Sequence, residues 1–261
     1  MIAITREISD DFAKCELTHF ERVPIDVDVA RAQHEEYVRV LAELGCRVIR
    51  ISSGEHLPDS VFIEDTAVVL DEVAIICRPG AESRRAEVDA VAGTLWLHRK
   101  LEEIQAPATI DGGDVLVAGR TLFIGRSSRT NDEAIAQCAR VCEPLGYQIR
   151  PVEVRECLHL KSAVTALDNR RLLVNPDWID TTVLTPFEVI DVHPDEPAAA
   201  NVVRLDAALV AAAAFPKTAS RLEHRGYLVR TVDVSEIAKA EGAVTCCSLI
   251  FSTSQETGFA L

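Results

Sequence analysis

Residues 66–77 have the sequence TAVVLDEVAIIC, in which Asp71 and Glu72 separate two short apolar runs. Two apolar runs joined by a short polar turn are typical of a β-hairpin. We therefore predict strands over 66–70 and 73–77.

The same pattern recurs along the chain. Further pairs of apolar runs flank short turns at 115–117 and 121–124, at 163–167 and 171–174, and at 201–205 and 207–215. The turn centres lie about 37 to 50 residues apart, which indicates a repeating supersecondary unit. Two further strands, predicted over 2–5 and 243–251, remain unpaired at the ends, and their pairing would supply a fifth unit and close a ring.

Helical patterns fill the gaps between the hairpins. The segment 29–45 places five residues on one helical face, namely Ala30, His34, Tyr37, Val38 and Leu41. Similar patterns predict helices over 86–99 and 132–145 and a helix beginning near 216. We predict one α/β domain over 1–261, with five hairpin-and-helix blades around a central axis and 252–261 as a candidate C-terminal extension.

Composition limits the classes of partner. The 261 residues are 48% hydrophobic, enough for a sizeable core, and 41 acidic against 27 basic residues give a formal charge of -14. This balance argues against nucleic acid or an anionic membrane as a partner and suits a cationic small molecule. Oligomeric state cannot be derived from these features.

Location and redox state follow from the same sequence. Charged residues break up the first twenty positions, and the longest apolar run, 207–215, is too short to span a bilayer. We therefore expect a cytoplasmic protein. Its eight cysteines are then expected to be reduced thiols, and because no pair has CxxC spacing, a structural zinc site is not expected.

Polar residues stand before the first three hairpins and in the closing strand, so their side chains would meet at the axis if the repeat is real. They comprise carboxylates in two segments, an imidazole with a lysine, and a pair of thiols: Asp59, Glu64 and Asp65; Asp111 and Asp114; His159 and Lys161; and Cys246 and Cys247. A thiol, an imidazole and carboxylates on one axis are typical of a cysteine-nucleophile site with a pocket for a cation.

Each of these residues also has a structural interpretation. A free cysteine is more often a core thiol than a nucleophile, and a lone histidine such as His159 is more often a satisfied structural group. Glu64 and Asp65 could cap a turn, and the glycine pair at 112–113 could form one. Their joint placement at equivalent positions of the repeat favours one site over several coincidences.

Several segments resemble, in order along nearly the whole chain, the dimethylarginine dimethylaminohydrolase family of guanidine-modifying enzymes. The matching segments are PDSVFIED at 58–65, RPGAESRR at 78–85, DGGDVL at 111–116, GRSSRTN at 125–131, LHLK at 158–161 and GAVTCCSL at 242–249. The resemblance implies the pentein fold, a five-bladed β/α propeller.

The resemblance also implies roles for individual residues. Cys246 matches the nucleophile, His159 the general acid and base, and Asp111 an acidic residue that supports the histidine. The other matching positions bind substrate: Glu64 and Asp65 at the guanidinium with Asp59 nearby, Arg84 and Arg129 at the α-carboxylate, and Leu17 on a mobile loop over the amino-acid end. Cys247 matches a position that the chemistry does not need.

The implied reaction converts an Nω-methylated arginine to citrulline and dimethylamine or methylamine, through a thiouronium on Cys246. Because the second reactant is water, no metal or organic cofactor is expected.

Two rivals remain open. An arginine or agmatine deiminase on the same fold would share the thiol, imidazole and carboxylates, although Arg84 and Arg129 favour a substrate with an α-carboxylate. A non-catalytic pentein that binds a macromolecule would have no reason to keep Cys246, His159 and the acidic pair together.

Overall fold

The computed structural model describes residues 1–54, 56–206 and 208–253. The candidate C-terminal extension at 252–261 lies outside the described residues from position 254 onward. No helix in the described ranges is long and apolar enough to cross a membrane.

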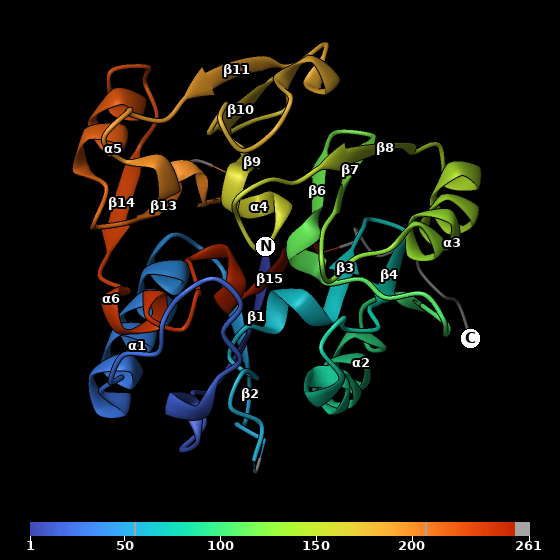
Figure 1. Ribbon diagram of the computed structural model, residues 1–261, viewed down its shortest axis with the longest axis horizontal. Coiled ribbons are helices and arrows are strands. Elements are labelled where there is room, and N and C mark those ends of the chain that lie inside the picture. The colour runs from blue at the N-terminus through green and yellow to red at the C-terminus, as the bar shows by residue number, and fades with distance from the viewer. Residues whose placement is uncertain (55, 207, 254–261) are drawn as a thin grey trace.

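Five three-stranded sheets surround a common centre (Figure 1). In each sheet the middle strand runs antiparallel to one neighbour and parallel to the other. The sheets are β3 (Ala67–Val69), β4 (Val73–Ile76) and β5 (Lys100–Glu103); β6 (Val115–Ala118), β7 (Thr121–Arg126) and β8 (Gln148–Glu153); β9 (Val164–Ala166), β10 (Arg171–Val174) and β11 (Glu188–Asp191); β12 (Val202–Arg204), β13 (Leu209–Ala212) and β14 (Val229–Val232); and β15 (Leu249–Phe251), β1 (Ile2–Arg6) and β2 (Arg47–Ile51). The predicted five-bladed β/α propeller is confirmed.

The fifth sheet joins the two ends of the chain. β15 pairs antiparallel with β1, with Ile2 opposite Phe251 and Ile4 opposite Leu249. β2 then adds in parallel on the other side of β1. The predicted closure of the ring by the terminal segments is confirmed.

Helices lie on the outside of the ring and connect the second and third strands of four sheets (Figure 1). They are α1 (Val27–Glu43), α2 (Val88–Leu95), α3 (Asp132–Cys142) and α5 (Pro216–Glu223). The β10–β11 connection, which the structure describes completely, contains only the 3-10 helix η6 (Thr181–Leu184). The expected helix is absent from this blade, because the connection has only thirteen residues and prolines at 176 and 186 leave nine residues between them.

Helix α1 shows how the sequence sets a boundary. Asp26 accepts hydrogen bonds from the backbone N–H groups of Asp28 and Val29 through Oδ1, both at 3.1 Å, so the helix begins two residues before the predicted start. All five residues of the predicted apolar face are buried. Two of the other predicted helices are partly 3-10 structure: η3 (Glu82–Glu87) precedes α2, and η5 (Glu143–Leu145) follows α3.

A short helical turn stands directly before the first strand of each sheet. These turns are η2 (Ile63–Thr66), η4 (Gly112–Asp114), α4 (Leu160–Ala163), η7 (Pro197–Ala200) and η8 (Thr245–Cys247). The strands that follow them, β3, β6, β9, β12 and β15, all contribute to a central cavity of about 230 Å³. The five turns therefore converge at the axis, as the repeat predicted.

The continuous strand predicted over 243–251 is wrong. Only 249–251 is strand, whereas 245–247 form η8, in which the N–H of Cys246 donates to the carbonyl of Ala243 at 3.2 Å. The N–H of Thr245 bonds to the side chain of Asn201 at 3.0 Å rather than to a neighbouring strand. Cys246 therefore projects from a turn.

The largest apolar cluster lies beneath α1 and includes the residues that flank Cys246. Tyr37 and Val244 are fully buried there, together with Phe12 of η1 (Phe12–Lys14) and Ile237 of α6 (Ser235–Ala238). The Tyr37 hydroxyl lies 2.6 Å from the Oγ atom of Ser248. This packing ties the segment around η8 to a long outer helix.

Candidate active site

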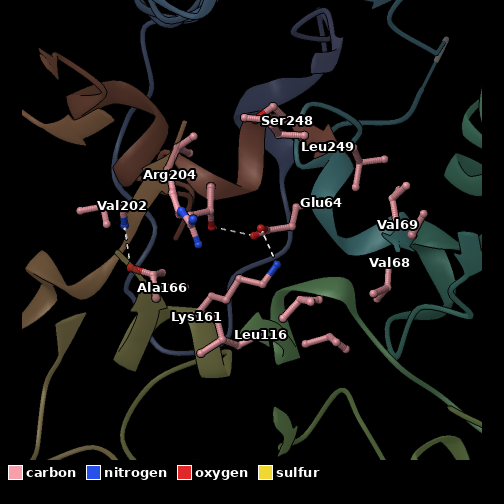
Figure 2. A pocket seen from close by; sticks show the side chains of 17 residues that line it. Glu64, Val68, Val69, Leu116, Lys161, Ala166, Val202, Arg204, Ser248 and Leu249 are labelled. Carbon is pink, nitrogen blue, oxygen red and sulfur yellow. Dashed lines mark hydrogen bonds and ion pairs between the residues drawn. The ribbon is translucent and has the colours of Figure 1, made fainter. Parts of the chain in front are cut away.

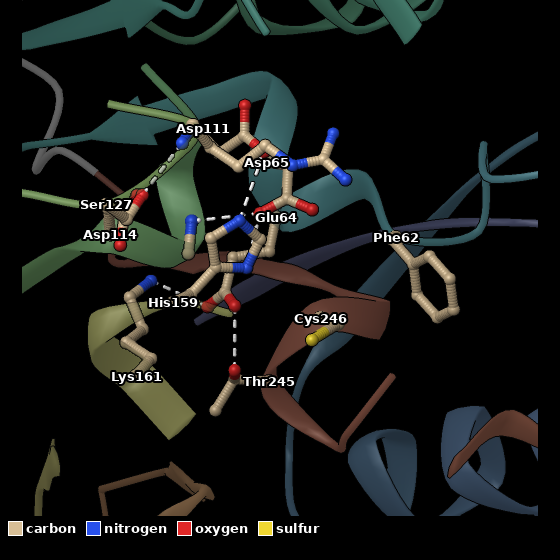
Figure 3. A network of polar contacts seen from close by, with 12 residues as sticks. Phe62, Glu64, Asp65, Asp111, Asp114, Ser127, His159, Lys161, Thr245 and Cys246 are labelled. Carbon is tan, nitrogen blue, oxygen red and sulfur yellow. Dashed lines mark hydrogen bonds and ion pairs between the residues drawn. The ribbon is translucent and has the colours of Figure 1, made fainter. Parts of the chain in front are cut away.

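A second cavity, of about 30 Å³, lies among the helical turns and is called here the reactive cavity. It brings together predicted residues from six separate segments of the sequence: Asp59, Asp65, Arg84, Asp111, Arg129, His159 and Cys246. Figure 3 shows the thiol of Cys246 on the side of this site opposite Asp111. A space this small holds about two water molecules.

His159 is held between two carboxylates. Its Nε2 atom lies 3.0 Å from Oδ2 of Asp111, and its Nδ1 atom lies 3.8 Å from Oδ1 of Asp65. Gly113 allows this approach, because a Cβ atom there would lie 2.7 Å from Nδ1 of His159 and 2.8 Å from Oδ1 of Asp65. Within the DGGD sequence, Asp111 therefore bonds to the imidazole and Gly113 leaves the space in which the imidazole packs.

The carboxylates stabilise a charged imidazole. Burial acts to lower the pKa of His159, but the charges of Asp65 and Asp114 and the hydrogen bond to Asp111 outweigh it and raise this pKa to about 9. His159 is therefore an imidazolium at neutral pH, and it can donate a proton.

The two neighbouring thiols have different surroundings. Cys246 is half-buried and lines the reactive cavity, with its Sγ atom accepting from the N–H of Ala243 at 3.4 Å. Cys247 is buried in the apolar cluster beneath α1, and its Sγ–H donates to the carbonyl of Ala243 at 3.6 Å. Only Cys246 can reach a molecule in this cavity.

Without a ligand, Cys246 is a neutral thiol. Burial raises the pKa of Cys246 to about 12, and the negative charges of Glu64 and Asp65 add to this shift. A thiolate is the reactive form, so ionisation needs a new positive charge beside Sγ. A cationic substrate supplies that charge in a site surrounded by carboxylates.

Asp65 and Arg84 form a buried ion pair. Nη1 of Arg84 lies 2.6 Å from Oδ2 of Asp65, and Nη2 lies 2.9 Å from the carboxylate of Glu87. Burial acts to raise the pKa of Asp65, but His159 and Arg84 hold it below its usual value. Asp65 is therefore an anion facing the cavity, whereas the charge of Arg84 is already balanced.

Arg129 differs from Arg84 in its pairing. It is half-buried, and its Nη2 atom donates to the Thr18 hydroxyl at 2.9 Å. Among the residues that the structure describes, no carboxylate forms an ion pair with Arg129. Of the two arginines expected to bind a carboxylate, Arg129 thus has the less compensated charge.

The structure places two predicted residues outside this cavity. Both oxygens of Glu64 accept hydrogen bonds, one from Lys161 at 2.6 Å and one from Thr245 at 2.7 Å, and the side chain lines the central cavity instead. Leu17 packs against the apolar cluster beneath α1, while its neighbour Glu16 lines the reactive cavity. Direct contact with substrate is thus expected from Asp65 and Glu16 rather than from the adjacent residues.

The sequence of the chain matches a known family. A family model described as N,N dimethylarginine dimethylhydrolase, eukaryotic, matches residues 10–251. The chain belongs to the dimethylarginine dimethylaminohydrolase family. It is 40% identical over 248 residues to the N(G),N(G)-dimethylarginine dimethylaminohydrolase of Streptomyces coelicolor, and the match covers 95% of each chain. The enzyme of the same name from Pseudomonas aeruginosa is 35% identical over 228 residues, which are 86% of this chain and 90% of the relative.

Solved structures agree with this membership. A cysteine-to-serine variant of the Pseudomonas aeruginosa dimethylarginine dimethylaminohydrolase, in complex with citrulline, superposes with a TM-score of 0.89 at 32% identity, covering 95% of this chain and 98% of that chain. The N-terminal domain of a cyanobacterial arginine dihydrolase, bound to product, has a TM-score of 0.85 over 95% of this chain and 96% of that one. Because its identity is 19%, this second likeness concerns the fold alone.

Sequence reasoning missed Glu241 and Gly242, which also line the reactive cavity of this dimethylaminohydrolase site. The carboxylate of Glu241 accepts hydrogen bonds from the backbone N–H groups of Thr18, His19 and Phe20, at 2.6 to 3.0 Å. Gly242 beside it is required, because a Cβ atom there would lie 2.2 Å from the Phe62 ring. The Glu241-Gly242 pair signals a turn, but nothing local in the sequence indicates its partner.

Asp65, Asp111 and His159 also place ligating atoms within 4.8 Å of one another, a geometry that could hold a metal ion. Arg84 lies 2.6 Å from Asp65, and this positive charge opposes a second cation. The carboxylates already stabilise an imidazolium. The contacts of His159 with Asp65 and Asp111 therefore account for the cluster without a metal.

Proposed function

We propose that this chain hydrolyses Nω-methylated arginines, namely asymmetric dimethylarginine and monomethylarginine, to citrulline and dimethylamine or methylamine. The observation that carries the proposal is the His159–Asp111 pair in one cavity with the thiol of Cys246, in a member of the dimethylarginine dimethylaminohydrolase family. The relatives at 40% and 35% identity bear the name of this activity.

The first half of the reaction uses Cys246 and His159. Asp65 holds the guanidinium by charge-assisted hydrogen bonds, and the guanidinium charge promotes ionisation of Cys246. The thiol proton passes to solvent, which leaves a Cys246 thiolate beside the His159 imidazolium. The Sγ atom of Cys246 then bonds to the guanidinium carbon. As the bond from this carbon to the methylated nitrogen breaks, His159 gives its proton to the departing amine, which leaves as dimethylamine or methylamine. The product on the enzyme is a thiouronium.

The second half consumes water. His159 is now neutral and takes a proton from a water molecule that attacks the same carbon. The carbon–sulfur bond breaks, citrulline forms and the thiol is restored. Water is the only other reactant, so we propose that no metal or organic cofactor takes part.

The same reasoning extends to the organisation of the protein. We propose that 1–261 acts as one catalytic domain, because the site draws on turns from separate blades of one ring. The substrate is a small cationic molecule. The cytoplasmic location expected from the sequence stays a prediction.

Purified protein is expected to form citrulline from asymmetric dimethylarginine in buffer that contains a metal chelator. The test measures citrulline and dimethylamine in equal amounts, with free arginine and agmatine assayed at the same concentrations. The deiminase rival predicts the opposite preference, so faster release of ammonia from free arginine would replace this proposal with that one.

Changing Arg129 to alanine is expected to raise the KM for asymmetric dimethylarginine by about 10- to 100-fold, because hydrogen bonds to a charged group contribute about 1.5–3 kcal/mol. Steady-state kinetics measure the effect. Arg126→Ala is the control, since Arg126 is exposed and pairs with Asp132 and Glu153 at the surface. An unchanged KM for Arg129→Ala would contradict its role at the α-carboxylate.

A further inference from the structure

Adjacent residues of two helical turns face different cavities. In η2, Glu64 lines the central cavity and Asp65 the reactive cavity. In η8, Thr245 lines the central cavity and Cys246 the reactive cavity. The layer between the two cavities thus consists of the backbone that carries the reactive groups.

A hydrogen-bond network lies on the side of this layer that faces the central cavity, and Figures 2 and 3 show part of it. Lys161 Nζ donates to Glu64 at 2.6 Å, and the Thr245 hydroxyl donates to the other oxygen of Glu64 at 2.7 Å. Nδ2 of Asn201 donates to the Thr245 hydroxyl at 2.9 Å and to the carbonyl of Lys161 at 3.1 Å. These four residues, called here the central network, form a closed loop.

Both polar atoms of the Asn201 side-chain amide form hydrogen bonds with η8. Its Oδ1 atom accepts from the backbone N–H of Thr245 at 3.0 Å, while Nδ2 bonds to the hydroxyl of the same residue. Asn201 is 5% exposed and Thr245 is 6% exposed. Buried polar groups with all their partners present fix one geometry, because the loss of any partner leaves an unsatisfied group.

The central network joins the nucleophile to the proton carrier. Thr245 directly precedes Cys246, and Lys161 follows two residues after His159. η8 is a single 3-10 turn with backbone hydrogen bonds of 3.2 and 3.4 Å, so its own backbone constrains it weakly. The side-chain contacts of Thr245 are therefore needed to set the direction of Cys246.

We propose that Asn201 and Thr245 are positioning residues that hold the Cys246 turn at a fixed place relative to the His159 turn. This rests on the proposed function. It also gives a role to the blade that contains β12, because none of the described residues that line the reactive cavity comes from η7 or β12. Asn201, which stands between η7 and β12, links this blade to η8 by hydrogen bonds.

Changing Thr245 to valine tests the proposal, because valine keeps the shape and removes the hydroxyl. The expected result is a fall in kcat of about 10- to 100-fold with KM within about threefold of wild type, since small misplacements of reacting groups have effects of this size. Thr245→Ser restores the hydroxyl and is expected to recover kcat to within about threefold of wild type.

Thr218→Val is the control. Thr218 is also a buried threonine with a hydrogen-bonded hydroxyl, but it lies on the outer helix α5, where this hydroxyl accepts from the backbone N–H of His193 at 3.0 Å. The kcat of Thr218→Val is expected to stay within about threefold of wild type. An equal loss of kcat in Thr218→Val and Thr245→Val, or unchanged kcat in Thr245→Val, overturns the proposal.

A second measurement does not depend on activity. Hydrogen exchange of the Thr245 amide is expected to accelerate by at least about tenfold in Asn201→Ala, and by a similar factor over 245–248 in Thr245→Val, but not in Thr218→Val. Unchanged exchange in the first two variants overturns the proposal. Should wild type fail to act on methylated arginines, the proposed function is wrong, while the exchange data still decide whether Asn201 holds η8.

Discussion

Replacing Cys246 with serine is expected to lower the turnover of asymmetric dimethylarginine by about 10³-fold or more. A serine hydroxyl ionises far less readily than a thiol, and Cys246 is the cysteine that lines the reactive cavity. The citrulline assay measures the loss. Mass spectrometry of wild type stopped during turnover should find the covalent thiouronium on the peptide that contains Cys246.

Cys247→Ser is the matched control, since it makes the same change one residue away. Cys247 is buried in the apolar cluster beneath α1, so its replacement is expected to lower thermal stability while kcat stays within about threefold of wild type. Activity that survives in Cys246→Ser and disappears in Cys247→Ser would reverse the assignment of the nucleophile.

Replacing His159 with glutamine is expected to lower kcat/KM by about 10²- to 10⁴-fold, the usual contribution of a general acid or base. Glutamine can keep a hydrogen bond to Asp111 but cannot transfer a proton. Substrate binding, judged by the dissociation constant of the product citrulline, should change much less. A His159→Gln variant with wild-type kcat/KM would remove His159 from the mechanism.

The pH profile of kcat/KM examines the same residue. Below about pH 9 the free enzyme holds a neutral Cys246 thiol and a charged His159, because their pKa values are raised to about 12 and about 9. The state that reacts has a Cys246 thiolate and a His159 imidazolium, so it carries one proton fewer than the free enzyme below about pH 9. The ratio kcat/KM should therefore rise with pH and level off near pH 9, where the free enzyme loses that proton from His159.

Asp111→Asn should move this bend to lower pH. The hydrogen bond to Asp111 and its negative charge both raise the pKa of His159, so an amide at this position lowers it. A bend at the same pH in wild type and Asp111→Asn would show that His159 does not control the profile.

The sequence was informative wherever structure depends on near neighbours. The hairpin at 66–77 and the buried face of α1 each follow from a pattern within one segment, and both are confirmed. The ring followed from the spacing of the hairpins and from the two unpaired end segments. The observed helix bounds differ from the predicted ones where a capping residue such as Asp26, rather than the apolar pattern, determines the start of the helix.

Features that depend on contacts between blades could not be predicted in this way. Glu64 and Asp65 are the same kind of residue in adjacent positions, yet a partner at position 161 holds one in the central cavity and a partner at position 84 holds the other beside the reactive cavity. The segment 243–251 has an apolar pattern, but Asn201 draws its first half into a turn. These side-chain pairings cannot be predicted from residue type alone.

The sheet that carries the nucleophile turn is made from opposite ends of the chain. β1 and β2 precede the strands of the other four blades in the sequence, whereas β15, which follows Cys246 and completes their sheet, comes after all of them. The other four blades therefore have all their strands before β15 is added during synthesis. A fragment that ends before β15 lacks the strand that anchors the Cys246 turn to β1, so it is expected to show no turnover even when the other four sheets have formed.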